Sequence, residues 1–426
     1  MDHKYKKMKK SIAIGIIGCG SMGKGLLYQS TIHPEIDCAA IADLRIDRCT
    51  AFLNRLDLPY EVVDNAGAMH RAIESNRIAV TENGDLIPQC AVIDAVVEAT
   101  NTVSEGGRYA VATLQHNKHL ILMNSEIDLI FGPYLKWLAK KHNVIFSSCD
   151  GDQYGVLKHL IDDLQLWGFE LVMAGNIKGF LDRYANPASI IQEADKRNLD
   201  YRMCTSYTDG TKLNIEMAIL ANVYGLAAPV PGMYGPTASH VCEVFQKFDF
   251  DRLWHDRKPF VDYILGAEPG GGVFAIGRCD HSYQREMLAY YKMGNGPYYL
   301  FYRPYHLCHI EALSSVASAV VRNTPFLQPD KGFQTNVYAY AKRNLKRGVA
   351  LDGIGGYDCY GMIENCIDQM VRPGLPICLA ENVVLNRNIQ KDEKIYIDDV
   401  IIAPGRFDFA LYEKALQLSV ASVPCV

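Results

Sequence analysis

Six residues near the N-terminus, Gly18-Cys19-Gly20-Ser21-Met22-Gly23, have the spacing G-x-G-x-x-G. In this motif the first glycine permits a tight turn, the second lets the backbone approach a pyrophosphate, and the third lets a helix pack against a strand. The free N–H groups of that helix attract phosphate. A strand-like run precedes the motif and a helical pattern follows it, so Gly18, Gly20, Ser21, Met22 and Gly23 are predicted to bind a dinucleotide.

An acidic residue follows at the expected distance. Asp43 lies 20 residues after Gly23, at the end of a second predicted strand, where a carboxylate binds the ribose hydroxyls of the adenosine. A carboxylate repels a 2′-phosphate, so NAD is favoured over NADP as the cofactor. Arg45 and Arg48 keep NADP open, although exposed charges on a helix explain these two arginines better.

Two later loops also follow predicted strands. Ala99, Thr100 and Asn101 end one strand, and Asn124 and Glu126 follow the next. Such loops lie at the carboxyl edge of a parallel sheet, beside the nicotinamide. We therefore expect Ala99–Asn101 and Asn124 to bind the cofactor. Glu126 either orients the ribose or substrate or caps a helix, and both interpretations stay open.

A lysine and a glutamate follow in the middle of the chain. Asp209-Gly210-Thr211-Lys212 leads into a predicted helix that carries Glu216. Lys212 and Glu216 are four residues apart and share one helical face. A lysine near the nicotinamide can move the proton that accompanies hydride transfer, or stabilise an alkoxide. From the spacing alone, an ordinary surface ion pair is the better explanation.

Cationic side chains form a candidate binding site for an anionic substrate. Arg303 and His306 lie in Tyr302–Leu307, which also holds two tyrosines and a proline. The planar fork of an arginine suits a phosphate or carboxylate, so Arg303 and His306, together with Lys178, are predicted to bind a small anionic substrate. A strand end with satisfied polar groups is the alternative. No metal site is predicted, because Asp150-Gly151-Asp152 is better explained as a helix N-cap.

The first third of the chain alternates apolar runs with helical patterns, which predicts right-handed βαβ units and a parallel sheet. This is the α/β pattern of a Rossmann domain, predicted over residues 1-150. The predicted strands are Ser11–Ile17, Ile36–Ala42, Ile93–Val97, His119–Met123 and Val144–Ser147, and the predicted helices are Met22–Ser30, Glu105–His116 and Pro133–His142.

Strand-like pieces, Glu170–Ala174 and Tyr201–Tyr207, mix with loops and a helix, Lys212–Val223, in the middle of the chain. They predict an α+β substrate and dimerisation domain over 151-325. The apolar helix His309–Val321 is expected to pack back on the Rossmann domain.

A weak internal repeat marks the end of the chain. Lys342–Gly348 lines up with Asn386–Asp392, and an apolar pair and an acidic residue follow each copy. Two similar turn-and-strand units predict a small β module over 326-426.

Composition limits the partners. The net charge of −5 makes a broad surface for nucleic acid unexpected. Thirteen cysteines without a CxxC pair fit reduced thiols in a cytoplasmic protein. The lysines of Met1–Lys10 are interpreted as a solvated tail, because the apolar run after them is too short for a signal peptide. No apolar stretch approaches the roughly 18 residues of a membrane span, so no membrane partner is expected.

These motifs together resemble the homoserine-dehydrogenase-like oxidoreductases with a C-terminal SAF domain, a group that includes the 1-deoxy-D-xylulose 5-phosphate reductoisomerase-like enzymes. The resemblance runs from about Ile12 to Pro404. It is carried by Gly18–Gly23, His119–Asn124 with Glu126, Asp209–Lys212 with Glu216, Gly235-Pro236, Gly296–Tyr298, Arg303–Leu307, Ala341–Asp352 and Gly374–Pro376.

The resemblance implies a Rossmann domain, a central catalytic and dimerisation domain, and a β-clip-like SAF domain at the C-terminus. It also implies a homo-oligomer that acts on a small, often phosphorylated, sugar-like substrate. It makes Lys212 a candidate catalytic residue, with Asp209 and Glu216 beside it, and supports Arg303 and His306 as pocket residues.

One departure from the group matters. A reductoisomerase is expected to use NADPH, and its second strand is not expected to end in an acid such as Asp43. The leading hypothesis is therefore NAD(P)-dependent hydride transfer to or from a small, phosphorylated sugar or polyol. An NADPH-dependent reductoisomerase of a deoxyketose phosphate and a non-catalytic dinucleotide- or carbohydrate-binding sensor are the alternatives.

Overall fold

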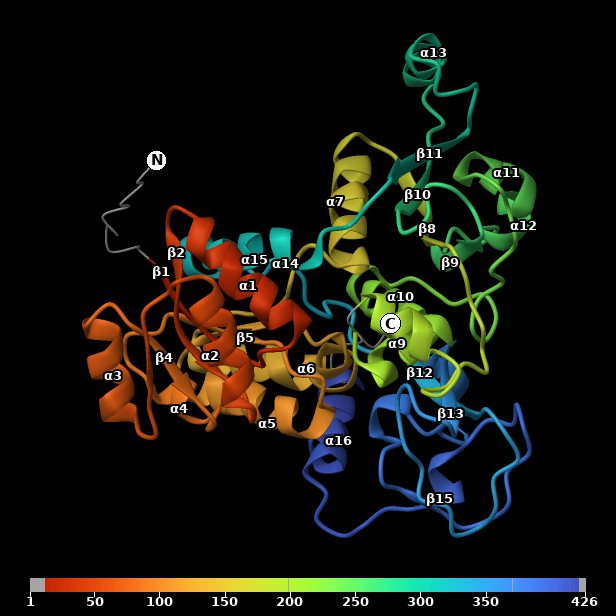
Figure 1. Ribbon diagram of the computed structural model, residues 1–426. Coiled ribbons are helices and arrows are strands. Elements are labelled where there is room, and N and C mark those ends of the chain that lie inside the picture. Colours follow the sequence, from red (N-terminus) through yellow and green to blue (C-terminus); the bar gives the residue numbers. More distant parts are fainter. Residues whose placement is uncertain (1–11, 198, 370, 421–426) are drawn as a thin grey trace. The chain divides into compact units, whose positions relative to one another are not determined.

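The computed structural model of the chain describes residues 12–197, 199–369 and 371–420 (Figure 1). The lysine-rich stretch Met1–Lys10 lies outside the described residues. Two compact units make up the chain. Unit 1 holds the described residues up to Gly151 together with Leu307–Gln328, and unit 2 holds Asp152–His306 and the described residues from Pro329 onward.

Unit 1 contains a sheet of seven parallel strands in the order β3-β4-β2-β1-β5-β6-β7. The strands are β1 (Ile12–Ile17), β2 (Ile36–Ala42), β3 (Tyr60–Val62), β4 (Ile78–Thr81), β5 (Ala95–Glu98), β6 (His119–Leu122) and β7 (Phe146–Ser148). Because β1 pairs with β2 on one side and β5 on the other, the strand order reverses at β1. Ligands of such sheets bind outside the carboxyl ends of the strands at this point.

Helices cover both faces of this sheet. They are α1 (Ser21–Ile32), α2 (Ile46–Arg55), α3 (Ala66–Glu74), α4 (Leu86–Gln89), α5 (Val103–Gln115) and α6 (Ser125–His142). Ile14 and Ile16 of β1 share a buried cluster with residues of α1 and α2, whereas Ile17 belongs to a second cluster with residues of α3 and α4. Burial on both faces explains the almost continuous apolar runs of these strands. Gly15 has no side chain because a Cβ there would lie 2.3 Å from Ile87.

Leu307–Gln328 add two further helices to unit 1, α14 (Cys308–Glu311) and α15 (Leu313–Arg322). Leu313, Val316 and Ala319 are buried in the same cluster as Ile14. The segment predicted as one helix, His309–Val321, is thus divided between α14 and α15. The second of these helices, α15, packs against β6 and β7.

Unit 2 begins with α7 (Gln153–Leu166) and contains a four-stranded sheet in the order β11-β10-β8-β9. The strands are β8 (Glu170–Lys178), β9 (Phe260–Leu265), β10 (Val273–Arg278) and β11 (Tyr298–Arg303). β8 and β9 are parallel, and β10 is antiparallel to both of its neighbours. α7 packs on β8 and β10. The remaining helices of this part are α8 (Ile191–Arg197), α9 (Tyr201–Thr208), α10 (Thr211–Tyr224), α11 (Val244–Lys247), α12 (Phe250–Leu253) and α13 (Ser282–Tyr290).

One predicted strand is wrong. Tyr201–Tyr207 lies within α9. The carboxylate of Asp200 accepts hydrogen bonds from the backbone N–H groups of Arg202 and Met203, at 3.0 and 3.1 Å, and so caps the helix. This N-cap stabilises the helical conformation over the strand that the tyrosines favour.

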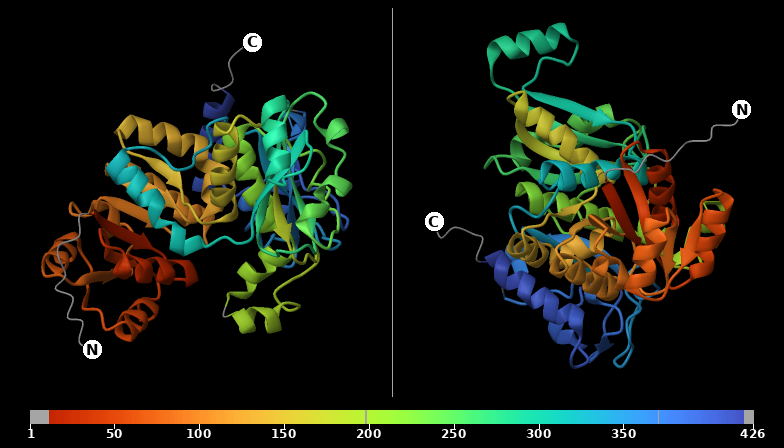
Figure 2. Two further views of the ribbon diagram at one scale, coloured as in Figure 1. Left: turned by 90° about the horizontal axis from the view of Figure 1, so that it is seen from above. Right: turned by 90° about the vertical axis from the view of Figure 1, so that its left-hand side faces the viewer.

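α13 stands at the end of the connection between β10 and β11, away from the sheet of unit 2 (Figures 1 and 2). None of its residues is buried. Tyr283, Tyr290 and Tyr291 are exposed on or beside it. α13 therefore contributes nothing to the core of unit 2.

The last part of unit 2 consists of short antiparallel pairs and a final helix. β12 (Thr335–Ala341) pairs with β13 (Cys359–Asn365), β14 (Val384–Leu385) pairs with β15 (Val400–Ile401), and α16 (Phe407–Val420) ends the described chain. α10 packs on β12 and β13.

The predicted internal repeat is confirmed. Leu345 and Ile389 hold the same position in the two copies, and each donates its N–H to the other's carbonyl oxygen, at 2.8 and 2.9 Å. The Oδ1 atoms of the equivalent Asn344 and Asn388 each accept a hydrogen bond from a backbone N–H of the other copy, at 2.8 and 2.9 Å. Because these contacts are reciprocal, the two copies are related by a local two-fold arrangement.

The predicted fold class is confirmed in its main parts, a Rossmann-type α/β sheet, a second α+β sheet and small C-terminal strands. The assignment of those strands to a SAF domain and the boundaries 1-150, 151-325 and 326-426 stay predictions. Within the described ranges, no helix is both long and apolar enough to cross a membrane.

Candidate functional site

The glycine loop of unit 1 has the geometry of a dinucleotide site. Gly18 has a φ of +106°, and a Cβ there would lie 2.6 Å from the carbonyl oxygen of Ala99. A Cβ on Gly23 would lie 1.9 Å from the carbonyl oxygen of Gly18, so only glycine lets α1 pack this closely. Gly20 differs, because a Cβ there would meet no atom within 4 Å. The packing of unit 1 therefore does not itself require a glycine at this position.

The start of α1 is available for an anion. The helix begins at Ser21 and Met22 directly after Gly20, which is the N-cap residue. No side chain caps this end, and its first turn contains no acidic residue. Backbone N–H groups and the positive end of the helix dipole therefore face the loop, as a pyrophosphate requires.

Asp43 is fixed beside this loop. Its Oδ2 accepts a hydrogen bond from the backbone N–H of Cys19 at 2.7 Å, and its Oδ1 accepts one from the N–H of Arg45 at 2.8 Å. The carboxylate is thereby tied to the glycine loop at the end of β2. The guanidinium of Arg45 contacts Asp47 at 3.2 Å, with both side chains more than half exposed. Arg45 is therefore engaged with a carboxylate of its own segment.

A buried acid follows the neighbouring strand. Glu98 ends β5 and is 0% exposed. Its Oε1 accepts hydrogen bonds from the hydroxyl of Thr100 and, at 3.0 Å, from the Thr100 N–H. Burial raises the pKa of Glu98 to about 8, and the charge of Glu126 adds to this effect. The carboxyl is thus largely protonated at neutral pH.

Two buried polar atoms at this sheet edge have no hydrogen-bond partner among the described residues, Oε2 of Glu98 and Oδ1 of Asn124. Such atoms cost free energy unless a ligand or a water satisfies them. Asn124 is the N-cap residue of α6, and its Nδ2 donates to the carbonyl of Thr102 at 3.2 Å. Both residues lie at the carboxyl edge of the sheet, on the β5 side of β1, where ligands of such sheets bind.

The remaining predicted cofactor residues lie in the same region. Thr100 supports Glu98, and Ala99 and Asn101 flank it in the loop after β5. Glu126 lies in the first turn of α6, where its Oε2 accepts a hydrogen bond from the hydroxyl of Ser125 at 3.2 Å. Sequence reasoning missed Glu98, although an acid at the end of an apolar strand was a signal that could have revealed it.

In unit 2 the carboxylate of Asp209 makes a tertiary ion pair. Oδ2 of Asp209 lies 2.8 Å from Nζ of Lys342, and Oδ1 accepts a hydrogen bond from the N–H of Thr211 at 2.8 Å. Burial raises the pKa of Asp209, and Lys342 partly offsets that rise. Lys212 and Glu216, on α10, are both buried rather than on the surface. Their catalytic roles stay predictions, as does that of Asp209.

The three predicted substrate residues meet at one edge of the second sheet. Lys178 ends β8 and Arg303 ends β11, and Val273 of β10 pairs with both strands at this edge. Nζ of Lys178 donates to the carbonyl of Tyr207 at 2.8 Å. Nδ1 of His306 donates to the carbonyl of Gly271, just before β10, at 2.7 Å. Because a carbonyl oxygen only accepts, Nδ1 of His306 carries a proton.

The sequence predicted no metal site, and that statement stays a prediction. Oδ2 of Asp150 accepts a hydrogen bond from the hydroxyl of Ser314 at 2.8 Å. Within unit 2, a carboxylate oxygen of Asp152 and a ring nitrogen of His306 lie within 4.8 Å of each other. Asp152 also caps α7 through the N–H of Gln153, which agrees with the predicted N-cap.

Comparison with known proteins shows that the chain is similar to oxidoreductases. Residues 151–312 match the family described as "Oxidoreductase DRL, catalytic domain". The homoserine dehydrogenase of Bacillus subtilis (strain 168) is 23% identical over 228 residues, which is 50% of this chain and 49% of that protein. This chain thus matches about half the length of its curated relative. The prediction that the chain is an enzyme of the oxidoreductase class is confirmed by the domain match.

The solved structures that are similar to this chain include the following two. A probable dehydrogenase from Thermotoga maritima has 12% sequence identity and a TM-score of 0.39, covering 74% of this chain and 90% of that chain. The scyllo-inositol dehydrogenase from Lactobacillus casei, solved with NAD(H) and scyllo-inositol, has 16% identity and a TM-score of 0.34, covering 64% of this chain and 67% of that chain.

Proposed function

We propose that this oxidoreductase transfers a hydride between NAD and a small, hydroxylated and phosphorylated substrate of the sugar or polyol type. The glycine loop and Asp43 carry the cofactor half of the proposal. Three glycines with three different steric environments stand next to a carboxylate that the loop itself holds in place. This is the arrangement that the pyrophosphate and the adenosine ribose require.

Each part of unit 1 has a role toward the dinucleotide. The N–H groups at Ser21 and Met22 bind the pyrophosphate, and Gly20 leaves room for it. Asp43 accepts hydrogen bonds from the ribose hydroxyls. Ala99–Asn101, which are not buried, bind the nicotinamide end together with Asn124. The bound nicotinamide supplies the hydride chemistry.

The charges around Asp43 favour NAD over NADP. A 2′-phosphate would lie against the Asp43 carboxylate, which costs free energy unless a cation compensates it. Arg45 already contacts Asp47 at 3.2 Å. NADP binding would need Arg45 or the exposed Arg48 to rearrange toward the phosphate.

Unit 2 supplies the substrate half. Lys178, Arg303 and His306 place two cations and an imidazole at one edge of a sheet, which suits a phosphate or carboxylate on the substrate. Lys212 is the candidate for the proton transfer that accompanies hydride transfer. A homo-oligomer is part of the same proposal through the resemblance, with the central domain as the dimerisation surface.

The test is a fluorescence titration of the purified protein with NADH and with NADPH. We expect NADH to bind more tightly, and Asp43→Ala to weaken NADH binding by tenfold or more while leaving NADPH binding less affected. Asp64→Ala, an exposed acid of unit 1 outside the glycine loop and its neighbours, is the matched control. An equal loss of NADH affinity in both variants would contradict the NAD assignment. Tighter binding of NADPH than of NADH by the wild-type protein would contradict it as well.

Turnover with sugar and polyol phosphates then tests the reaction. Oxidation of the substrate with its carbon skeleton intact supports the dehydrogenase, whereas a rearranged skeleton identifies a reductoisomerase. Dinucleotide binding without redox exchange under any of these conditions would identify a sensor. Lys212→Met should lower kcat with little change in the affinity for NADH.

A further inference from the structure

A second polar pocket lies in the C-terminal part of unit 2. Its volume is about 400 Å³, within the usual range for sites of small ligands. Its lining includes Tyr184, from the loop after β8, and Lys342, Arg343, Asp352, Tyr357 and Asp358, from the ends of β12 and β13 and the loop between them. No cofactor or substrate residue predicted from the sequence lines it.

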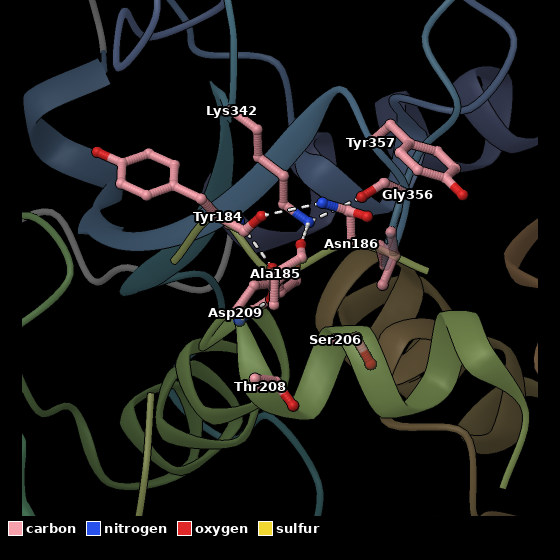
Figure 3. A network of polar contacts seen from close by, with 12 residues as sticks. Tyr184, Ala185, Asn186, Ser206, Thr208, Asp209, Lys342, Gly356 and Tyr357 are labelled. Carbon is pink, nitrogen blue, oxygen red and sulfur yellow. Dashed lines mark hydrogen bonds and ion pairs between the residues drawn. The ribbon is translucent and has the colours of Figure 1, made fainter. Parts of the chain in front are cut away.

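A buried ammonium group fixes the walls of this pocket. Nζ of Lys342 donates to the carbonyl oxygens of Ala185 and Gly356, at 2.6 and 2.8 Å, and pairs with Asp209 (Figure 3). Ala185 belongs to the loop of Tyr184, and Gly356 precedes Tyr357. One lysine therefore holds both loops against the start of α10, so the pocket is built before any ligand arrives.

The lining of the pocket includes an ion pair with unused hydrogen-bonding capacity. Nε and Nη2 of Arg343 both donate to a single oxygen of Asp358, Oδ1, at 3.2 and 2.7 Å. Nη1 of Arg343 and Oδ2 of Asp358 have no partner among the described residues. The hydroxyl of Tyr357 is likewise without a partner in the described part of the chain.

The internal repeat provides a comparison for this arginine. Arg387 holds the position of Arg343 in the second copy, and all three nitrogens of its guanidinium make a contact. Its Nε and Nη2 donate to the two oxygens of Asp399, at 2.5 and 2.8 Å, and its Nη1 contacts Glu393 at 2.8 Å. The same repeat position is thus closed in one copy and left half-satisfied in the other, where the pocket lies.

We propose that this pocket binds a neutral, polyhydroxylated ligand of sugar or polyol size. One hydroxyl of the ligand accepts a hydrogen bond from Nη1 of Arg343, and the neighbouring hydroxyl donates to Oδ2 of Asp358. A guanidinium beside a carboxylate matches adjacent hydroxyls, which both donate and accept. The half-exposed rings of Tyr184 and Tyr357 flank the ligand, and the hydroxyl of Tyr357 adds a third polar contact.

The charges of the lining favour a neutral ligand over a phosphate ester. Two cations, Lys342 and Arg343, face the carboxylates of Asp352 and Asp358, and Asp209 already neutralises Lys342. A phosphate would meet these carboxylates and would have to displace Asp358 from Arg343. The site therefore differs in ligand class from the anionic substrate proposed above, and it does not depend on hydride transfer.

Isothermal titration calorimetry of the full chain tests this proposal, with xylitol, myo-inositol and D-ribose as probes and D-ribose 5-phosphate for comparison. We expect saturable binding of at least one neutral probe, and weaker binding of the phosphate ester at this site. Arg343→Gln should weaken the neutral probe tenfold or more, and Tyr357→Phe should weaken it severalfold. The matched control is Arg347→Gln, since Arg347 is exposed in the same segment.

Variants of the other polar edge separate the two sites. Binding of the neutral probe should persist in Arg303→Gln and in Lys212→Met. Loss of binding in Arg303→Gln together with normal binding in Arg343→Gln would place the probe at the predicted substrate edge and overturn the proposal. Absence of saturable binding of every neutral probe to the wild-type chain would overturn the proposal as well. Unchanged binding in Arg343→Gln, with a melting temperature equal to that of the wild type, would also overturn it.

Discussion

Removal of the Lys342 ammonium should destabilise unit 2 strongly. The side chains of Lys342 and Asp209 are 3% and 0% exposed, and their charged atoms lie 2.8 Å apart. Lys342→Met keeps most of the side-chain volume but leaves the Asp209 carboxylate buried without its counter-charge. Breaking a buried pair from one side costs about 3–5 kcal/mol. The variant also leaves the carbonyl oxygens of Ala185 and Gly356 without this donor.

The loss should depend on pH, with a sign that follows from Asp209. Burial already raises the pKa of this carboxyl in the folded protein, and Lys342 opposes that rise. Without Lys342 the folded-state pKa rises further, so the folded state holds a proton that the unfolded chain releases. Stability of Lys342→Met therefore falls as pH rises through the unfolded and then the folded pKa of Asp209, and the deficit shrinks in acid.

Urea unfolding and thermal melting at several pH values measure this effect. For a unit of this size, about 3–5 kcal/mol corresponds to a shift in Tm of roughly 6–20 °C. Lys346→Met, an exposed lysine of the same segment, is the control and should change stability by less than about 0.5 kcal/mol. The double variant Asp209→Asn/Lys342→Met should be more stable than Lys342→Met alone. A loss for Lys342→Met below about 1 kcal/mol, or one that grows in acid, would refute this reasoning.

Three further predictions concern single positions. Gly20→Ala should leave the melting temperature unchanged, because its Cβ would meet no protein atom within 4 Å. The same variant should weaken NADH binding tenfold or more in a fluorescence titration, because the Cβ would occupy the space of the ligand. Gly23→Ala should weaken NADH binding and also lower the melting temperature, because its Cβ would lie 1.9 Å from a backbone oxygen. Since the pKa of Glu98 is raised to about 8 from 4.5, stability should fall as pH rises between these values, and Glu98→Gln should abolish that slope in urea unfolding; a slope that persists in the variant would assign it to another group. Asn388→Ala should cost about 1 kcal/mol in urea unfolding, because it removes a hydrogen bond across the repeat, and a neutral result would show that the contact is replaced by water.

The sequence by itself determined the features that depend on local geometry. The G-x-G-x-x-G spacing and the apolar runs around it predicted a strand, a turn and a helix, and each lies where the spacing placed it. Asp43 lies beside the loop, as predicted, and its binding to ribose stays a prediction. A turn that only glycine adopts and a helix that begins directly after it are dictated by neighbouring residues. The repeat was readable because its two copies share one residue pattern, although their pairing with each other is a tertiary contact.

Tertiary structure decided which charged groups meet. Lys342 and Asp209 are separated by more than a hundred residues, and their pairing depends on how β12 and α10 pack. No spacing rule distinguishes Arg343 from Arg387. All three guanidinium nitrogens of Arg387 make a contact, whereas Nη1 of Arg343 has no partner among the described residues. The sequence placed Glu98 at the end of an apolar strand. The fold buries this carboxyl completely, and burial raises its pKa to about 8. Local sequence fixes backbone conformation over a few residues, whereas burial and charge pairing arise from contacts between segments that the chain brings together only when it folds.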